Sequence, residues 1–392
     1  MKCKLNALVV VSVIAVCGLA MSCSSVVYRE DVAEVADSAS VERLQEHMEA
    51  LTALGPRRAG DAEVGQLTAA YLEQQLWGMG IETERETFAL TPSAKLIVLL
   101  KEGGPSVDGA VESWEVPGVF FGRNISQVRV VEGFVRKAGL FERFAGYGIE
   151  PGEADSVEQI NVMATIPGTI APERVLEISA HHDTVPGTVG ADDNTSSVAV
   201  LLEVARLLRE NPPACSVRLC FFAAEEIGLL GSQEHVRLMQ EQGRVDEVFA
   251  LINMDGVGHF TSEPNTQDSP IRIPFVVWPP KTGNFLGIIG ANGSGWLGDL
   301  VEDAGAIYVE DLPTYSLARL GGFFPDARRS DHAHYWDLDI PAVFLTDTND
   351  FRTDNYHRPS DDLSSINMDA LRNVAALVYA SAASVTNLEA TP

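Results

Sequence analysis

Residues 174–208 read RVLEISAHHDTVPGTVGADDNTSSVAVLLEVARLL, and this stretch decides the fold. Residues 174–179 have apolar side chains at positions 175, 176 and 178, two of them β-branched, which predicts a strand. Residues 197–208 repeat apolar side chains at helical spacing, at positions 198, 201, 202, 205 and 208. A strand followed by a loop and a helix is the first half of a βαβ unit, so we expect a sheet covered by helices.

The same alternation of strands and helices continues on both sides of this stretch. Toward the C-terminus we predict helices at residues 229–240 and 371–383 and strands at 217–222, 248–252, 286–290, 307–309 and 341–346. Toward the N-terminus we predict helices at 41–54 and 62–79 and strands at 83–89 and 96–100. The pattern predicts an α/β fold, a three-layer αβα sandwich around a mixed, mostly parallel central sheet.

The composition indicates a globular protein and argues against one class of partner. The chain has 392 residues, of which 46% are hydrophobic and 21% are charged, as expected for a protein with a large packed core. Its formal net charge of −27 argues against nucleic acid as a partner, because binding phosphates needs a basic face. Most acidic side chains should be solvated, and the charge is also compatible with a site for divalent cations.

The first residues have the pattern of a secretory signal. A basic start, Met1-Lys2-Cys3-Lys4, is followed by an apolar run that ends in small residues. Residues 18–23, GLAMSC, resemble the lipobox of bacterial lipoproteins, in which the cysteine carries the lipid. We therefore predict a signal peptide over residues 1–22 and an exported lipoprotein, anchored through Cys23 and facing the periplasm or cell exterior. Plain cleavage and an uncleaved anchor are the alternatives.

The rest of the chain is divided by its patterning. We predict a polar tether over residues 23–39 and a single domain over residues 40–390. Residues 103–158 and 258–330 show no clear period, and we expect insertions or a cap over the site there.

Few cysteines are available for disulfides. Cys3 and Cys17 belong to the predicted signal, and Cys23 would carry lipid. Cys215 and Cys220 flank one predicted strand, where five residues separate them by more than a disulfide can span. We therefore expect no internal disulfide.

Acidic and imidazole side chains stand just past the predicted strands. His181 follows the first strand of the opening stretch, Glu225 and Glu226 follow the next, and Asp255 follows the third. His357 lies in a loop shortly before the closing helix. Because open α/β sheets bind ligands at the carboxyl ends of their strands, we expect these side chains to converge on one site.

These residue types suit divalent metal ions. Imidazole and carboxylate groups are ligands that zinc and related metals prefer, and five ligands hold two metals if one carboxylate bridges. Asp193 comes twelve residues after His181 and precedes a predicted helix, so it could lie under both ions. Asp183, two residues after His181, is expected to accept the free ring N–H of that imidazole.

Five strings resemble, in the same order, the motifs of the co-catalytic zinc aminopeptidases of clan MH, which also includes glutaminyl cyclases. They are residues 178–208, residues 224–232 (AEEIGLLGS), Asn253-Met254-Asp255, Ser330-Asp331-His332 and residues 356–361 (YHRPSD). The resemblance covers roughly residue 55 to the C-terminus and is weak between about 94 and 158. It implies the αβα fold of the zinc aminopeptidases, which is also called phosphorylase/hydrolase-like.

The resemblance assigns the metal ligands. It implies that His181 and Asp255 hold one zinc ion, that Glu226 and His357 hold the other, and that Asp193 bridges the two. The cofactors implied are therefore two Zn²⁺ ions.

The resemblance also implies the chemistry. Glu225 is the expected general base, Tyr356 resembles the tyrosine that stabilises the oxyanion, and Asp183 is counted with the catalytic set. The implied activity is an aminopeptidase that removes the N-terminal residue from peptides with a free N-terminus.

Several alternatives stay open. A glutaminyl-cyclase-like acyltransferase uses the same scaffold with one zinc, but a tryptophan typically precedes the last histidine there, whereas this chain has Tyr356. A non-catalytic ectodomain of this fold and a carboxypeptidase for acidic peptides are two more. Residues 293–298, GSGWLG, fit a dinucleotide-binding G-x-G-x-x-G, yet Glu310 comes too early for the acidic residue of that motif, so we interpret them as a turn.

Overall fold

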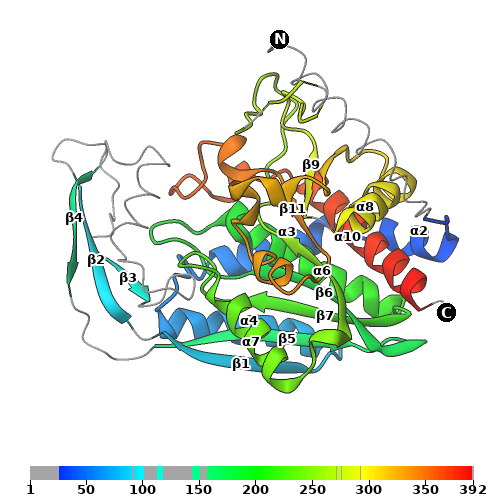
Figure 1. Ribbon diagram of the computed structural model, residues 1–392, viewed down its shortest axis with the longest axis horizontal. Helices are drawn as coiled ribbons and strands as arrows, with labels where there is room; N and C mark the ends of the chain where they lie inside the picture. The colour runs from blue at the N-terminus through cyan, green and yellow to red at the C-terminus, as the bar shows by residue number, and fades with distance from the viewer. Residues whose placement is uncertain are drawn as a thin grey trace, which may run out of the picture.

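The computed structural model describes residues 26–90, 92–100, 113–117, 144–150, 157–270, 272–274, 276–291 and 293–390. Its centre is an eight-stranded sheet with the order β1-β5-β7-β6-β8-β11-β9-β10 (Figure 1). In that order the strands are Thr83–Leu90, Val157–Ile166, Cys215–Phe222, Ala171–His181, Val248–Met254, Ala342–Thr346, Leu286–Gly290 and Thr314–Leu317.

The sheet is mixed, as predicted. Strands β7, β6, β8 and β11 run parallel to one another, and β9 pairs parallel with β10. Antiparallel pairing joins β1 to β5, β5 to β7 and β11 to β9. The parallel centre therefore brings the carboxyl ends of β6, β7, β8 and β11 to one edge.

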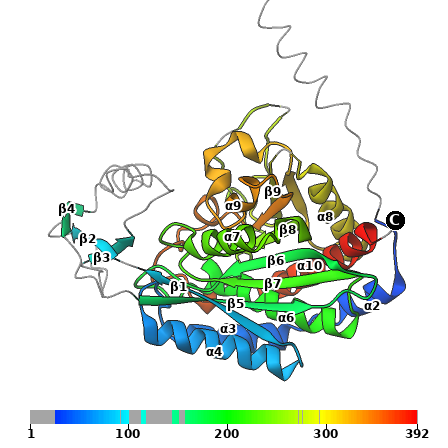
Figure 2. The same cartoon turned by 60° about the horizontal axis from the view of Figure 1, so that its bottom comes forward.

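Helices cover both faces of the sheet, which confirms the three-layer prediction. Figure 2 shows α3, α4 and α6 below the sheet and α7 above it. The helices are α2 (Glu30–Asp37), α3 (Val41–Thr52), α4 (Ala62–Gly78), α6 (Ser197–Glu210), α7 (Leu230–Gln242), α8 (Gly295–Tyr308), α9 (Ala333–Trp336) and α10 (Met368–Glu389). Within the described ranges, none of them combines the length and apolar character that a membrane span needs.

The central strands do not alternate apolar and polar residues, because both faces of the sheet are covered by the core. Every residue of β7 is buried, and so is most of β6, because helices pack on both faces. Helix α6 buries Leu201, Leu202 and Leu208 against the sheet, as its apolar spacing predicts. Cys215 and Cys220 are free and buried, which confirms the absence of a disulfide between them.

The predicted tether over residues 23–39 is wrong in its second half. Residues 30–37 form helix α2, whose Val32 and Ala36 are 1% exposed and join the main core. The helix has only two buried side chains, so its apolar face is too short to stand out in the sequence. Residues 1–25, with the predicted signal and Cys23, lie outside the described residues.

The strand predicted at 307–309 is also wrong. Residues 307 and 308 are the last turn of α8, and the edge strand of this region is β10 instead. A run of three apolar residues does not distinguish a strand from the end of a helix.

The glycines of residues 293–298 mark a turn only in part, because Gly295 and Gly298 lie in α8. A side chain at Gly298 would overlap with Ala318, so close packing requires this glycine.

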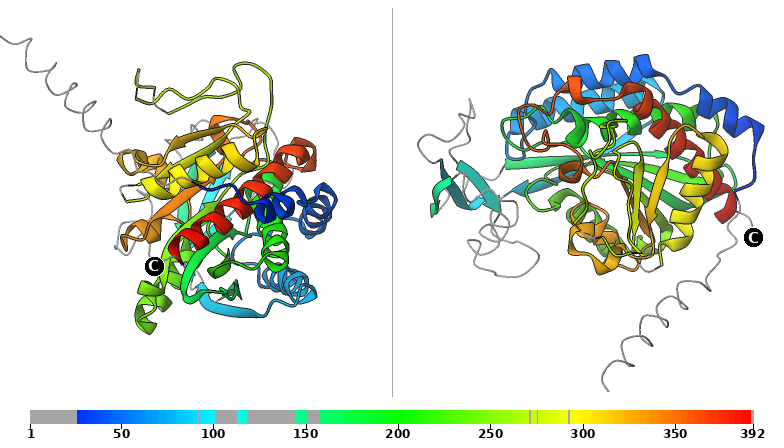
Figure 3. Two further views of the ribbon diagram at one scale, coloured as in Figure 1. Left: turned by 90° about the vertical axis from the view of Figure 1, so that its right-hand side faces the viewer. Right: turned by 90° about the horizontal axis from the view of Figure 1, so that it is seen from above.

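The insertion predicted at 103–158 lies largely outside the described residues. Two described pieces of it, β3 (Ser113–Pro117) and β4 (Phe144–Glu150), pair antiparallel with β2 (Pro92–Leu100) in a separate three-stranded sheet. The second predicted insertion begins with a segment of irregular structure between β8 and β9. This segment stands above the sheet in the left view of Figure 3.

A buried network of charges fastens α7 to the sheet. His235 of α7 places its Nδ1 atom 2.9 Å from Glu86 and its Nε2 atom 3.2 Å from Glu177, so both ring nitrogens face carboxylates. Glu177 also accepts hydrogen bonds from Arg218 (2.5 Å) and the Tyr335 hydroxyl (2.6 Å). Burial lowers the pKa of His235, but Glu177 and Glu86 outweigh it and raise that pKa to about 9. The imidazole is therefore charged at neutral pH.

We expect His235 to make stability depend on alkaline pH. Folding raises the pKa of His235 from 6.5 to about 9, which contributes on the order of 3 kcal/mol to the free energy of unfolding. This contribution is present in full below pH 6.5 and is lost as pH rises through 9. The free energy of unfolding lost in His235→Gln, measured by urea denaturation, should therefore shrink between about pH 6.5 and pH 9.5.

His47 provides the matched control. Burial lowers its pKa to about 4, so it is neutral over the whole range tested. The destabilisation caused by His47→Gln should thus be the same at about pH 7 and pH 9.5. A destabilisation by His235→Gln that is equally independent of pH would show that His235 is uncharged in the folded protein.

Candidate metal centre

The carboxyl edge of the parallel strands brings the predicted ligands together. His181 is the last residue of β6, Glu225 and Glu226 follow β7, and Asp255 directly follows β8. His357 comes from the loop between β11 and α10. All five lie at one site, because adjacent parallel strands end at the same edge.

Asp193 is held below this edge by two neighbours. The backbone N–H groups of Asp192 and Asp193 donate to the two carboxylate oxygens of Asp361, at 2.8 and 3.2 Å. Asn194 donates to the carbonyl of Met254 (3.0 Å) and accepts from the N–H of Gly256 (3.1 Å). These contacts tie the loop before α6 to the end of β8, which fixes the direction of the Asp193 carboxylate.

The two oxygens of Asp193 face two different histidines. Its Oδ1 atom lies 3.2 Å from Nε2 of His181, and its Oδ2 atom lies 3.1 Å from Nε2 of His357. Glu226 Oε2 is 3.1 Å from the same nitrogen of His357, and Asp255 Oδ2 is 3.8 Å from Nε2 of His181. Two triads of ligand atoms therefore share one carboxylate, the arrangement expected for a bridging ligand.

The donor atoms of these triads fit metal ions. The Nε2 atoms of His181 and His357 and the Oε1 atom of Glu226 are buried without a hydrogen-bond partner among the described residues. A buried polar atom left unpaired costs free energy, and a cation between the triads would satisfy each of these atoms. The spacing of each triad, with its ligand atoms within 4.8 Å of one another, is compatible with a single ion.

The electrostatics of the site favour the same interpretation. Burial raises the pKa of Glu226 to about 7, and the charge of Asp193 adds to this effect. Burial likewise raises the pKa of Glu225 well above its usual range, with further contributions from Asp255 and Glu226. Carboxylates so crowded and desolvated need positive charge to stay ionised, and bound divalent cations supply it.

Asp183 contacts the predicted partner, the free ring nitrogen of His181, and has further partners. The Nδ1 atom of His181 is 3.2 Å from the backbone carbonyl of Asp183 and 3.5 Å from its carboxylate, so the carbonyl is the closer acceptor. The carboxylate accepts the backbone N–H groups of Glu225 (3.0 Å) and Glu226 (3.3 Å). Asp183 therefore positions the glutamate pair with its side chain and the imidazole mainly with its backbone.

Tyr356 lies beside the second triad. Its ring stacks on that of His357 with centroids 3.8 Å apart, and its hydroxyl accepts a hydrogen bond from Arg329 (3.2 Å). Because Arg329 donates this bond, the phenolic proton stays available to another acceptor.

Three further residues of the site were not assigned from the sequence. Asn349 donates to Asp255 Oδ1 (3.2 Å), and Arg329 contacts Tyr356. Asp331 accepts a hydrogen bond from Ser232 (2.5 Å), and burial raises its pKa to about 7. Of these, only Asp331 had a signal, the Ser330-Asp331-His332 string, because the other two act through contacts between distant segments.

Sequence comparisons find relatives that match parts of the chain. Protein YfbL of Escherichia coli K12 is 32% identical over 214 residues, which are 50% of this chain and 62% of that protein. Aminopeptidase YwaD of Bacillus subtilis is 40% identical over 93 residues, 24% of this chain and 20% of the relative. The chain thus spans less than two thirds of the length of these relatives.

Solved structures share the fold. A zinc aminopeptidase from Bacillus subtilis matches with a TM-score of 0.62 and 17% identity, over 88% of this chain and 95% of that one. A glutaminyl cyclase from Bacteroides thetaiotaomicron matches with a TM-score of 0.54 and 14% identity, over 88% and 97%. At such identities the likeness concerns the fold, which both kinds of enzyme share.

The family follows from a longer match. The sequence model of peptidase family M28 matches residues 161–382, more than half of the chain. The matched range contains every ligand of the two triads, namely His181, Asp193, Glu226, Asp255 and His357. The chain belongs to peptidase family M28.

Proposed function

We propose that this protein is a zinc aminopeptidase that uses two zinc ions to remove N-terminal residues from peptides. One observation carries the proposal: two triads of buried ligand atoms share the two oxygens of Asp193. Membership of a peptidase family and the name of the relative YwaD, an aminopeptidase, support the reaction class.

The chain's own residues suit peptide hydrolysis. When bound, two zinc ions would polarise the scissile carbonyl and make a water molecule more acidic. The carboxylate of Glu225 lies 3.8 Å from the Nε2 atom of His181, beyond hydrogen-bond distance, so it is not committed to that ring. Asp183 fixes the Glu225 backbone, so the carboxylate is positioned to take a proton from water and pass it to the leaving amine.

Tyr356 is suited to stabilise the developing oxyanion. Its hydroxyl lies at the site and accepts from Arg329, which leaves the phenolic proton free to donate to the carbonyl oxygen. Burial raises the pKa of Tyr356 well above its usual range, although Arg329 opposes the rise, so the phenol keeps its proton at neutral pH.

Two observations favour this function over the nearest alternatives. A single-zinc acyltransferase has no need of a second complete triad, yet His181, Asp193 and Asp255 form one here. A non-catalytic ectodomain would have no reason to keep Glu225 buried and its backbone held by Asp183.

One prediction of this proposal concerns the metal. We expect the purified protein to bind two zinc ions and to hydrolyse aminoacyl p-nitroanilides that have a free amino group. Chelation should abolish hydrolysis, and added zinc should restore it. Elemental analysis and the chelator titration are the measurements, with N-acetylated substrates as the control. Activity that survives complete removal of metal would contradict the proposal.

A further prediction separates the roles of the two adjacent glutamates. Glu225→Gln keeps the size of the side chain but cannot accept a proton, so kcat should fall by about 10²–10⁴-fold while zinc content stays near two. Glu226→Gln should instead lose zinc from the triad that contains His357, and excess zinc should restore part of its activity. Zinc loss in Glu225→Gln and retention in Glu226→Gln would mean that the two roles are reversed.

We also propose that the protein is exported and anchored by a lipid on Cys23. The basic start, the apolar run and the string GLAMSC support this proposal. We expect the parent protein isolated from cells to partition with membranes and the Cys23→Ser variant to appear in the soluble fraction. Intact-mass spectra should show that the parent is heavier than the variant by the mass of the lipid. Equal partitioning and equal modification of both proteins would refute the anchor.

A further inference from the structure

Two adjacent arginines in the turn between α3 and α4 have opposite surroundings. The side chain of Arg58 is 53% exposed, whereas Arg57 is 3% exposed. Burial lowers the pKa of Arg57 to about 10, although Asp183, Asp361 and Asp193 oppose the fall, so the guanidinium is charged at neutral pH. A buried cation costs free energy unless hydrogen bonds replace its lost hydration, so the partners of Arg57 indicate what it does.

Most partners of the Arg57 side chain lie in residues 182–195, which we call the ligand loop. Its Nε atom donates to the carbonyl of His182 (2.8 Å), and its Nη2 atom donates to the Thr195 hydroxyl (2.6 Å). Its Nη1 atom donates to the carbonyls of Val189 and of Leu51 in α3, both at 3.1 Å. All four acceptors are neutral oxygen atoms, so these bonds fix the position of the loop rather than neutralise a charge.

The backbone of Arg57 holds the same loop. Its N–H donates to the Thr184 hydroxyl (3.0 Å), and its carbonyl accepts the N–H of Thr184 (3.2 Å). Two hydroxyl groups of the loop then bond within the loop: Thr184 donates to the carbonyl of Thr188 (3.3 Å), and Thr195 donates to that of Gly190 (2.5 Å). The ligand loop is therefore folded around Arg57.

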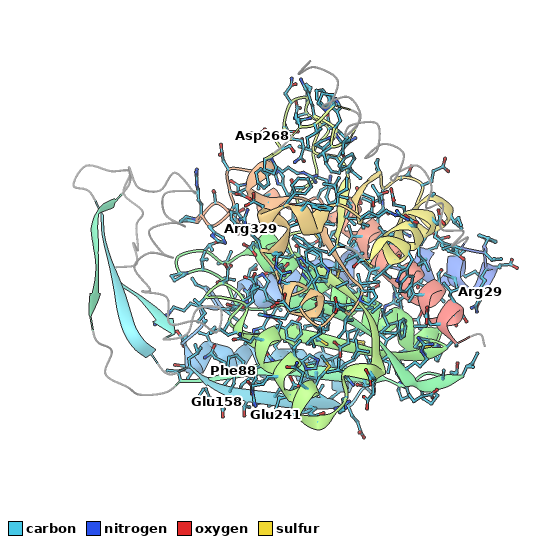
Figure 4. The ribbon with its side chains drawn as sticks, in the orientation of Figure 1. Arg29, Phe88, Glu158, Glu241, Asp268 and Arg329 are labelled. Carbon is cyan, nitrogen blue, oxygen red and sulfur yellow. The ribbon has the colours of Figure 1, made fainter. Side chains whose placement is uncertain are left out.

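The ligand loop positions one metal ligand near each of its ends. His181 directly precedes the loop, and Asp193 lies close to its last residue. Arg329, which is labelled in Figure 4, marks the side of the molecule on which they lie, because it contacts Tyr356 beside the second triad. Residues 182–190 belong to no helix or strand, so single hydrogen bonds must hold the backbone between the two ligands. These bonds therefore set how far the strand-end imidazole lies from the bridging carboxylate.

We infer that Arg57 is a positioning residue of the metal centre, which holds His181 and the bridging carboxylate of Asp193 at their spacing before a metal ion binds. This inference rests on the zinc binding of the proposed function. Only one of the four side-chain bonds, the bond to Leu51, reaches α3, so fastening that helix does not account for the other three. Contacts that orient metal ligands from outside are typically worth about 10–100-fold in metal affinity.

The experiment measures the zinc affinity of the folded protein by competition with a chelator of known affinity. Arg57→Met removes the charge and the four side-chain hydrogen bonds. We expect the Kd for at least one of the two zinc ions to rise by about 10–100-fold, and excess zinc to restore part of the lost hydrolysis. Arg57→Lys should recover part of the affinity, because an ammonium group keeps the charge and can replace some of the bonds but not the planar fork.

Two control variants separate positioning from a general loss of stability. Arg58→Met changes the exposed neighbour, and it should leave both the zinc affinity and the free energy of unfolding unchanged. Arg218→Met removes a second buried arginine, which is 6% exposed and donates to Glu177 in the network that fastens α7. That variant should lose stability in urea denaturation of the metal-free protein, but once folded it should bind zinc as the parent does.

A milder variant keeps the test decisive if Arg57→Met does not fold. Thr195→Val keeps the shape of the side chain and removes the hydroxyl that accepts from Arg57 and donates to the carbonyl of Gly190. We expect the Kd for zinc to rise by about 3–10-fold, the scale of a single hydrogen bond.

The outcomes separate this inference from the function on which it rests. A parent protein that binds two zinc ions but hydrolyses no aminoacyl substrate refutes the aminopeptidase proposal, while the affinity measurement still tests Arg57. The role of Arg57 is overturned if folded Arg57→Met, or Thr195→Val in its place, binds zinc as tightly as the parent. It is also overturned if Arg218→Met weakens zinc binding to the same extent as Arg57→Met. A parent that binds no zinc refutes both proposals.

Discussion

The site depends on one constraint, that the carboxylate of Asp193 must face two histidines at once. His181 ends a strand and His357 lies in a loop far along the chain, so only the tertiary fold brings both to Asp193. The hydrogen bonds from the Asp192 and Asp193 backbone to Asp361 hold the carboxylate in that position. They therefore support the one side chain that both triads share.

Each anionic group of the site is supported from a different segment of the chain. Asp183 holds the backbone of Glu225 and Glu226, and Asn349 holds Asp255. Such supports orient the ligands before any ion arrives, and outer contacts of this kind tune metal affinity as well as geometry. The edge of the parallel sheet thus supplies the ligands, while the loops around it supply their orientation.

The parts predicted from the sequence share a local signal. The strands before His181, Glu225 and Asp255 are apolar runs, and parallel strands end at one edge, so their convergence could be predicted. The roles of the ligands came from the family resemblance. The short helix at 30–37 and the end of α8 carry weak or ambiguous patterns and were predicted wrongly. Asn349 and Arg57 act on Asp255 and His182 across 94 and 125 residues of chain, where no periodicity exists to reveal a contact.

Ligand types alone do not decide where a metal binds in this protein. Glu177, Cys220 and His235 also lie close enough together to hold an ion. In that cluster, however, Arg218 and Tyr335 already donate to the Glu177 carboxylate, and the charged His235 balances Glu86. At the metal centre the buried carboxylates outnumber the imidazoles, and three of its ligand atoms have no partner among the described residues. Unbalanced charge and unpaired atoms together, rather than residue types, therefore distinguish the metal centre from a structural network of charges.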